Sequence, residues 1–352
     1  MHSKAFPFIL KFFVASTLLT TCSCDEIARE FTARNSPSVE QPIRKTVADS
    51  TKSRVDHSLS NSIANLKLIE VESINTGQKY TIGIGLPTSY HSDTNKTYPV
   101  IYQLDAEIAL HTSIETSRGL AVSGDLEEVI IVGIFNYALH SELLDLTPSK
   151  ATHPDTKFVG NITENLPTGE SDLFYKFLVD ELMPKINASY RADKISNVLF
   201  GHSLGGLFCL STLQKEKSPF SHYLISSPAL WWNNKEVLKK KLPKRNFEPV
   251  VYLSVGGLEQ IPSNLPKKKR EKIPELDRKM DKATKRISGV IEVYDYLQRQ
   301  GNVDVYAHVE EGEVHMSSNV PSFSRGIRTL LLGAHRDELR HRSFDSPLLP
   351  WE

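Results

Sequence analysis

The chain has 352 residues, and its 42 Lys plus Arg balance its 42 Asp plus Glu, so the formal net charge is zero. A balanced chain has no global field that would recruit nucleic acid or an anionic membrane surface, and any charge preference has to be local. The length allows one large α/β domain with a single extensive core.

Residues 1–24 have the composition of a secretory signal. Two lysines precede a short apolar run, 12–19, and small residues follow it. The run is shorter than the roughly 20 residues that a membrane-spanning helix needs. Cys22 and Cys24 each end an imperfect lipoprotein cleavage box, so both are lipidation candidates. We expect an exported protein, either periplasmic or anchored to the membrane by lipid; an uncleaved leader is the alternative.

Residues 25–64 are polar, rich in Ser and poor in aromatic residues, which is typical of a flexible linker. Apolar patterning begins at residue 65, and we expect one folded domain over 65–352. The one cysteine beyond the leader is Cys209, within an apolar helical pattern. It is expected to be a small core residue, without a disulfide partner.

The predicted elements start with two alternating segments, "LKLIEVESI" and "QKYTIGIGLP", which indicate an antiparallel hairpin of half-buried strands. Short runs that are apolar throughout follow, as in strands covered on both faces. They lie at 99–104, 128–135, 197–200, 222–227, 249–255 and 303–309. Helical patterns lie at 171–188, 204–215, 234–241, 275–300 and 320–332. This alternation predicts an α/β fold with a mostly parallel sheet and helices on both faces.

The pentapeptide "GHSLG", residues 201–205, matches the G-x-S-x-G pattern between a predicted strand and a predicted helix. In that context the serine, Ser203, is held on a sharp turn above the sheet as a nucleophile. Side chains at the glycine positions would collide with the neighbouring strand and helix. The N–H of Leu204 opens the helix and can point at a developing oxyanion. A glycine-rich structural turn without a catalytic role is the alternative.

A serine nucleophile needs a base, and the base needs a group that orients it. His315 follows the last predicted strand, in "EEGEVHMSS", and is the candidate base. Glu259 follows the preceding strand and is the candidate acid, with Asp277 and Asp281 as alternatives and a dyad without an acid as a further one. His202, inside the elbow, is expected to face away.

Backbone and aromatic groups complete the predicted site. The N–H groups of Ala106 or Glu107, in "YQLDAEIAL", are candidates for the second oxyanion donor, with Asp105 shaping the turn. Trp231 and Trp232 follow a predicted strand and its Pro, where they can line a substrate pocket. Burial in the core is the alternative for the two tryptophans.

Several blocks in order, among them "YPVIYQLDAE", "LFGHSLGGLFCL", "SSPALWWNN", "VYLSVGGLEQ" and "EGEVH", resemble the putative-esterase branch of the α/β hydrolases, over about residues 65–333. That branch includes siderophore esterases and the esterase D type. The resemblance implies an α/β-hydrolase fold and a Ser–acid–His hydrolase without a metal or other cofactor, with the roles on Ser203, His315 and Glu259. The sequence has Ala106 where relatives have glycine. It also has Glu142, and no arginine, in a segment where relatives carry arginines for acidic substrates.

The expected function is that of an exported serine carboxylic-ester hydrolase, acting on siderophore-like or small acyl esters through an acyl-enzyme. Its expected partner is a small-molecule ester, not nucleic acid. Two alternatives remain: an acyltransferase to a sugar or lipid alcohol, and a non-catalytic envelope binding protein of the same fold.

Overall fold

The computed structural model describes residues 65–136, 139–152, 166–273 and 275–332, without the side chains of a few residues in the helices at 139–146 and 275–284. The expected signal, the linker and the lipidation candidates Cys22 and Cys24 lie outside these residues. Within the described part of the chain, no helix is long and apolar enough to cross a membrane. All described residues belong to one compact unit.

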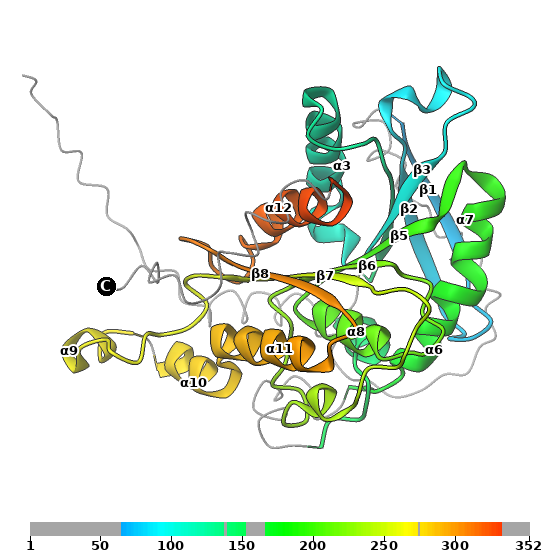
Figure 1. Ribbon diagram of the computed structural model, residues 1–352. Helices are drawn as coiled ribbons and strands as arrows, with labels where there is room; N and C mark the ends of the chain where they lie inside the picture. The colour runs from blue at the N-terminus through cyan, green and yellow to red at the C-terminus, as the bar shows by residue number, and fades with distance from the viewer. Residues whose placement is uncertain (1–64, 137–138, 153–165, 274, 333–352) are drawn as a thin grey trace, which may run out of the picture. The chain divides into compact units, whose positions relative to one another are not determined.

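In the described part of the chain, eight strands form a single sheet in the order β1-β2-β4-β3-β5-β6-β7-β8 (Figure 1). They are β1 (Leu66–Glu72), β2 (Lys79–Gly85), β3 (Tyr98–Gln103), β4 (Ile130–Phe135), β5 (Ala192–His202), β6 (His222–Ser226), β7 (Val250–Gly256) and β8 (Asp304–Glu310). β2 pairs antiparallel with β1 and β4, while every other neighbouring pair is parallel. The mostly parallel sheet with an N-terminal antiparallel hairpin is confirmed.

Helices cover both faces of the sheet, and each face has its own apolar core (Figure 1). On one face lie α3 (Ala106–Ser123) and α12 (Asn319–Leu332). On the other lie α6 (Ser171–Lys176), the π-helical turn η2 (Phe177–Leu182), α7 (Met183–Ser189), α8 (Leu204–Leu213) and α11 (Arg286–Gln300). The remaining helices are η1 (Thr88–His91), α4 (Leu139–Leu146), η3 (Glu236–Lys239), α9 (Lys267–Arg270) and α10 (Glu275–Thr284).

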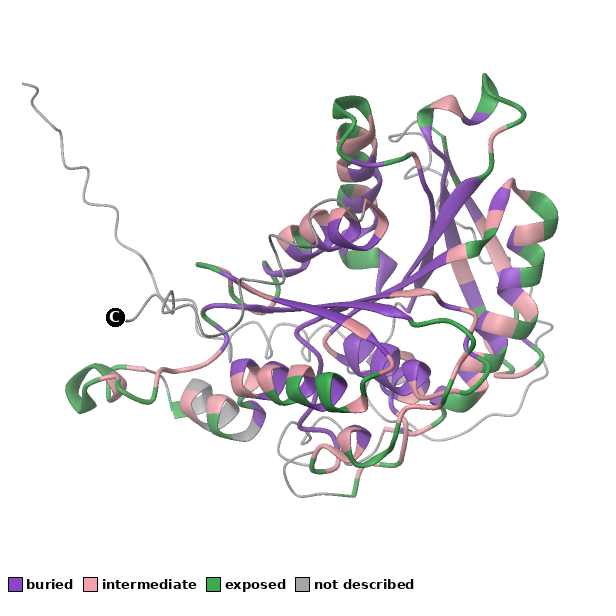
Figure 2. Ribbon diagram, viewed as in Figure 1, coloured by how far each residue is buried: buried purple, intermediate pink, exposed green. Residues whose placement is uncertain are grey.

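The central strands are buried along their length, as Figure 2 shows. Every residue of β3, β4 and β7 is buried, which is the pattern expected of strands covered on both faces. Cys209 is free and fully buried on α8, in the larger core, as expected. Because these strands pair in parallel, their carboxyl ends meet at one edge of the sheet.

Three predicted helices differ from those in the structure. The pattern at 234–241 forms only the short 3-10 helix η3, because Lys235 before it is in a left-handed conformation with φ of 56°. The pattern at 275–300 is two helices, α10 and α11, which meet at Lys285 in a left-handed conformation with φ of 42°. The pattern at 171–188 contains the π-helical turn η2, which ends at Leu182, two residues before Pro184. Proline lacks an N–H, and its ring collides with the preceding turn of a regular α-helix, so the helix widens there.

Candidate active site

The nucleophile elbow is present as the sequence predicts. β5 ends at His202, α8 begins at Leu204, and Ser203 between them has φ of 53° and ψ of −113°. A Cβ atom at Gly201 would lie 2.2 Å from the carbonyl oxygen of Gly205. The turn is therefore closed to a side chain at that position, and Ser203 stays in a conformation that non-glycine residues rarely adopt.

A continuous line of hydrogen bonds joins three of the expected site residues. The Oγ of Ser203 lies 3.0 Å from the Nε2 of His315, and the Nδ1 of His315 lies 2.7 Å from a carboxylate oxygen of Glu259. Because that carboxylate can only accept, the Nδ1 carries the proton and Nε2 is left to accept from Ser203. Glu259 follows β7 and His315 follows β8, and these strands are neighbours in the sheet.

The carboxylate of Glu259 is held by donors that the sequence motifs do not reveal. Its Oε1 accepts from the hydroxyl of Ser227 at 2.5 Å and from the N–H of Gly256 at 2.7 Å. The Nε of Arg286 lies 3.6 Å from its Oε2. Burial raises the pKa of Glu259, but the hydrogen bond and charge of His315 and the two donors outweigh it and bring the pKa to about 2.

The two alternative acids have other surroundings. The carboxylate of Asp281 accepts from the N–H of Ile261 at 2.6 Å, so it is engaged away from His315. Asp277 lies on α10, and its side chain is outside the described part of the structure. Of the three, only Glu259 is seen in contact with His315.

His202 lies against the site, so the expectation that it faces away is wrong. Its ring centroid is 4.6 Å from that of His315, and its Nδ1 lies 3.1 Å from the hydroxyl of Ser226. Burial, followed by the charge of His315, lowers the pKa of His202 to about 3, which keeps its ring neutral at physiological pH. His202 thus supplies a flat, uncharged surface behind the imidazole of His315.

The oxyanion candidates begin two helices at the same edge of the sheet. Leu204 is the first residue of α8, and Ala106 is the first of α3, directly after Asp105 with φ of 52°. The two loops are in contact, because a Cβ atom at Gly205 would lie 3.0 Å from Oδ2 of Asp105. The carboxylate of Glu107 accepts from the N–H of Asn136 at 3.2 Å.

Ala106, where the resemblance implies a glycine, is accommodated without backbone strain. Ala106 does not have a positive φ, unlike Asp105 before it. A Cβ atom at Gly133 would lie 2.8 Å from the methyl group of Ala106. The missing side chain at Gly133 therefore makes room for the one at Ala106. The oxyanion roles of Leu204, Ala106 and Glu107 stay predictions.

Three carboxyl groups surround the start of α3. Burial raises the pKa of Asp105, and the charges of Glu142 and Glu107 raise it further. Burial and the charge of Glu107 raise the pKa of Glu142 to about 7. Among the described residues, no group of three or more His, Cys, Asp or Glu side chains is arranged to hold a metal ion.

The tryptophans are placed in the core. Trp231 is 8% exposed and Trp232 is fully buried, and the indole N–H of Trp232 donates to the carbonyl oxygen of Ser149 at 3.2 Å. A cavity of about 490 Å³ lies beside His315, but neither tryptophan is among the residues that line it. Their role in a substrate pocket stays a prediction.

The fold and this site define the class of the protein. A mostly parallel sheet covered on both faces, with an elbow serine at the carboxyl edge of a central strand, is the architecture of the α/β hydrolases. A solved structure that shares the fold is the BES protein from Bacillus cereus, with a TM-score of 0.61 and 27% sequence identity over 84% of this chain and 99% of that one.

The chain belongs to the putative esterase family, whose sequence model matches residues 73–296. It is similar to the ferri-bacillibactin esterase BesA of Bacillus subtilis, with 30% identity over 60% of this chain and 78% of the relative. It is also similar to a siderophore enterobactin esterase of Emericella nidulans, with 26% identity over 71% of this chain and 89% of the relative. The protein is thus a carboxylic-ester hydrolase.

Proposed function

We propose that the protein hydrolyses small-molecule esters through an acyl-enzyme on Ser203. The observation that carries the proposal is the line of hydrogen bonds from Ser203 through His315 to Glu259. Ser203 is partly exposed, so an ester can reach its hydroxyl. A serine hydroxyl is a weak nucleophile near neutral pH, and a base at hydrogen-bond distance is what activates it.

In the first half of the reaction, the Oγ of Ser203 attacks the ester carbonyl carbon while the Nε2 of His315 takes its proton. The negative charge on the carbonyl oxygen is stabilised by N–H groups at the starts of α8 and α3, with those of Leu204 and Ala106 as donors. Nε2 then gives the proton to the alcohol oxygen as the ester C–O bond breaks, and the acyl group stays on Ser203.

In the second half, water takes the place of the alcohol. Nε2 of His315 takes a proton from the water as its oxygen attacks the acyl carbon, and the same proton returns to the Oγ of Ser203 when the carboxylic acid leaves. Glu259 fixes the imidazole in the required tautomer and stabilises the imidazolium formed in each half.

The substrates that we propose are siderophore-like esters or small acyl esters. BesA is a ferri-bacillibactin esterase, and the relative from Emericella nidulans is a siderophore enterobactin esterase. The start of α3 is surrounded by the carboxyl groups of Asp105, Glu107 and Glu142, none of which can pair with an anionic group of a substrate. A panel that pairs a siderophore lactone with neutral short-chain esters separates these possibilities.

The test is hydrolysis of p-nitrophenyl acetate by the purified full chain. Ser203→Ala is expected to lower the rate at least about a thousandfold, because the nucleophile is removed. Ser123→Ala, at an exposed serine of α3, is the matched control. Intact-mass measurement after rapid acid quenching is expected to show one added acetyl group on the parent and none on Ser203→Ala. A parent without turnover, or product formed mainly on an added alcohol, would contradict hydrolysis.

We also propose that the protein is exported, as a periplasmic or lipid-anchored protein, on the basis of the leader in residues 1–24. Mass spectrometry of the mature amino terminus tests this. A diacylated or triacylated Cys22 or Cys24 is the expected result for the anchored form, and an intact Met1 would contradict export.

A further inference from the structure

The cavity beside His315 is formed by a long connection at the edge of the sheet. Its volume is about 490 Å³. It lies between the turn after β7, the segment that carries α9 and α10, the start of α11 and the loop after β8. The described residues that line it include Glu259, Gln260, Asp281, Arg286 and His315, together with apolar side chains.

The proposed role of His315 indicates which part of the ester would lie in this cavity. Both His315 and Glu259 belong to its wall, whereas Ser203 lies across the imidazole, 3.0 Å from Nε2. Nε2 hands its proton to the departing alcohol oxygen, so that oxygen has to lie on the His315 side of Ser203. A group attached to the same oxygen and extending past the imidazole enters the cavity.

The charged groups in the wall are already engaged. The Nε of Arg286 faces Glu259 at 3.6 Å, and the carboxylate of Asp281 accepts from the N–H of Ile261 at 2.6 Å. The side-chain amide of Gln260 donates to the hydroxyl of Ser288 and accepts from its N–H, both at 2.8 Å. Asp281 and Gln260 are therefore hydrogen-bonded within the protein, and the charge of Arg286 is paired with that of Glu259.

More than half of the surface that the wall offers a ligand is apolar. Six of the lining side chains are apolar: Leu258, Ile261, Pro262, Leu265, Ile273 and Val314. Two of them, Leu258 and Val314, are 43% and 50% exposed, and Met316 next to His315 is 55% exposed. Covering such surface gains about 25 cal/mol for each Å² removed from water.

We propose that this cavity binds the alcohol part of the ester, and that the preferred alcohols are bulky, uncharged and ring-bearing. An apolar cavity of about 150 Å³ is enough to hold benzene, so the present one has room for a bicyclic group. The proposal rests on the hydrolase function proposed above. It adds that the alcohol part of the ester determines which substrates are preferred.

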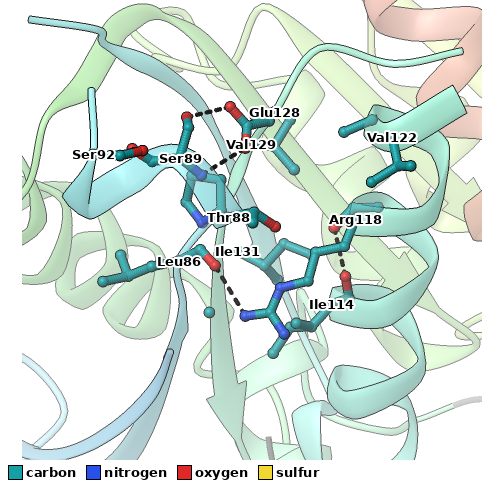
Figure 3. Close-up of a pocket in the computed structure, with 14 residues that line it drawn as sticks. Leu86, Thr88, Ser89, Ser92, Ile114, Arg118, Val122, Glu128, Val129 and Ile131 are labelled. Carbon is teal, nitrogen blue, oxygen red and sulfur yellow. Dashed lines mark hydrogen bonds between the residues drawn. The ribbon is translucent and has the colours of Figure 1, made fainter. Parts of the chain in front are cut away.

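A second cavity supplies the control. Figure 3 shows it between α3 and the end of β2, with a volume of about 310 Å³. There the guanidinium of Arg118 donates to the carbonyl oxygen of Leu86, and the carboxylate of Glu128 accepts from Ser89. Because β4 begins beside this cavity, it lies at the amino edge of the parallel strands, opposite to Ser203. Val122 lines it and is 86% exposed.

The test compares two acetates whose alcohols are both primary, ethyl acetate and 2-(2-naphthyl)ethyl acetate. We expect kcat/KM for the naphthyl ester to exceed that for the ethyl ester at least tenfold. Leu265→Trp fills the cavity and is expected to reduce this ratio at least fivefold, and Val314→Trp is a second variant in case the first does not fold. Val122→Trp is expected to leave the ratio unchanged.

Binding of the product alcohol makes the test independent of turnover. We expect 2-(2-naphthyl)ethanol to bind Ser203→Ala in a calorimetric titration, and at least fivefold more weakly when Leu265→Trp is added. If Leu265→Trp weakens binding of the alcohol but the parent hydrolyses no ester, the cavity is shown to bind the alcohol and the proposed hydrolase function is wrong. If the cavity variants change selectivity among ethyl esters of different acids instead, or change neither property, the alcohol-site proposal is wrong.

Discussion

Glu259 stays ionised inside the protein because its surroundings favour the charged form. The hydroxyl of Ser227 and the N–H of Gly256 donate to one of its oxygens, while His315 and the guanidinium of Arg286 face the other. A buried carboxylate with such partners is a strong orienting group, because its charge is stabilised before the reaction begins. The orientation of the imidazole then costs no rearrangement in the transition state.

Replacing this carboxylate by an amide tests its role. Glu259→Gln keeps the shape but lets the imidazole adopt the wrong tautomer, so kcat/KM is expected to fall about a hundred- to ten-thousandfold. Glu292→Gln, at an exposed carboxylate of α11 that bonds Lys235, is the control and is expected to keep the parent rate. A fall of less than about threefold for Glu259→Gln in the p-nitrophenyl acetate assay would show that another group orients His315.

At the residue scale, the sequence predicts the residues whose positions depend on motifs and on the ends of strands. Ser203, His315 and Glu259 each follow a recognisable strand, so their meeting at one edge could be expected. Arg286 could not be expected there, because its contact with Glu259 depends on where α11 begins. The contact of His202 with His315 could not be predicted either. The sequence does not show to which side the last residue of a strand turns when a strained elbow follows it.

The elbow is an element whose geometry depends on missing side chains. A Cβ at Gly201 would meet the carbonyl oxygen of Gly205 at 2.2 Å, and this is backbone that cannot move without shifting α8. Gly201→Ala is therefore expected to reduce turnover at least about a hundredfold and to lower the urea midpoint.

Gly119→Ala is the matched control for this change. A Cβ at Gly119, in the middle of α3, would have no heavy atom within 4 Å, so alanine is expected to stabilise the helix by about 1 kcal/mol and to leave turnover unaltered. Equal activities and equal midpoints for the two alanine variants would mean that the elbow is not sterically closed.

The strands of this fold could be predicted, but one long helix could not. The strands appear as continuous apolar runs, whereas α3 was absent from the sequence prediction. Its buried face consists of Ala106, Ala109, Leu110, Ser113, Ile114 and Ser117. Small and hydroxyl-bearing residues pack close to the sheet here, and this face gives little periodic hydrophobic signal.

At the scale of the whole molecule, the sheet determines which segments meet. The alternation of strands and helices predicts parallel pairing, but not the order β4-β3-β5 at the centre, because long crossovers can place successive strands on either side. That order puts the elbow beside the start of α3 and leaves the 490 Å³ cavity at the β7–β8 end. The predicted oxyanion donors and the proposed alcohol cavity thus come from different parts of the chain.

Asp145 makes the stability of the whole fold depend on pH. Its carboxyl group, on α4, accepts from the hydroxyl of Tyr80 at 3.0 Å and from the amide of Gln78 at 3.1 Å, which ties the N-terminal hairpin to the helix. Burial raises the pKa of Asp145 to about 7, although these two donors lower it. Because the folded-state pKa lies above the unfolded value of 3.8, protonated Asp145 contributes stability that is complete below pH 3.8 and is lost as pH rises through 7.

Asp145→Asn removes this ionisation and keeps an acceptor for Gln78. The variant is expected to gain stability relative to the parent between pH 4 and pH 8, by up to about 4 kcal/mol, because the parent alone has to ionise a buried group. Urea unfolding of both proteins at several pH values measures the difference. A difference that stays constant over this range, or that grows in favour of the parent as pH rises, would show that Asp145 ionises in the folded protein at least as readily as in water.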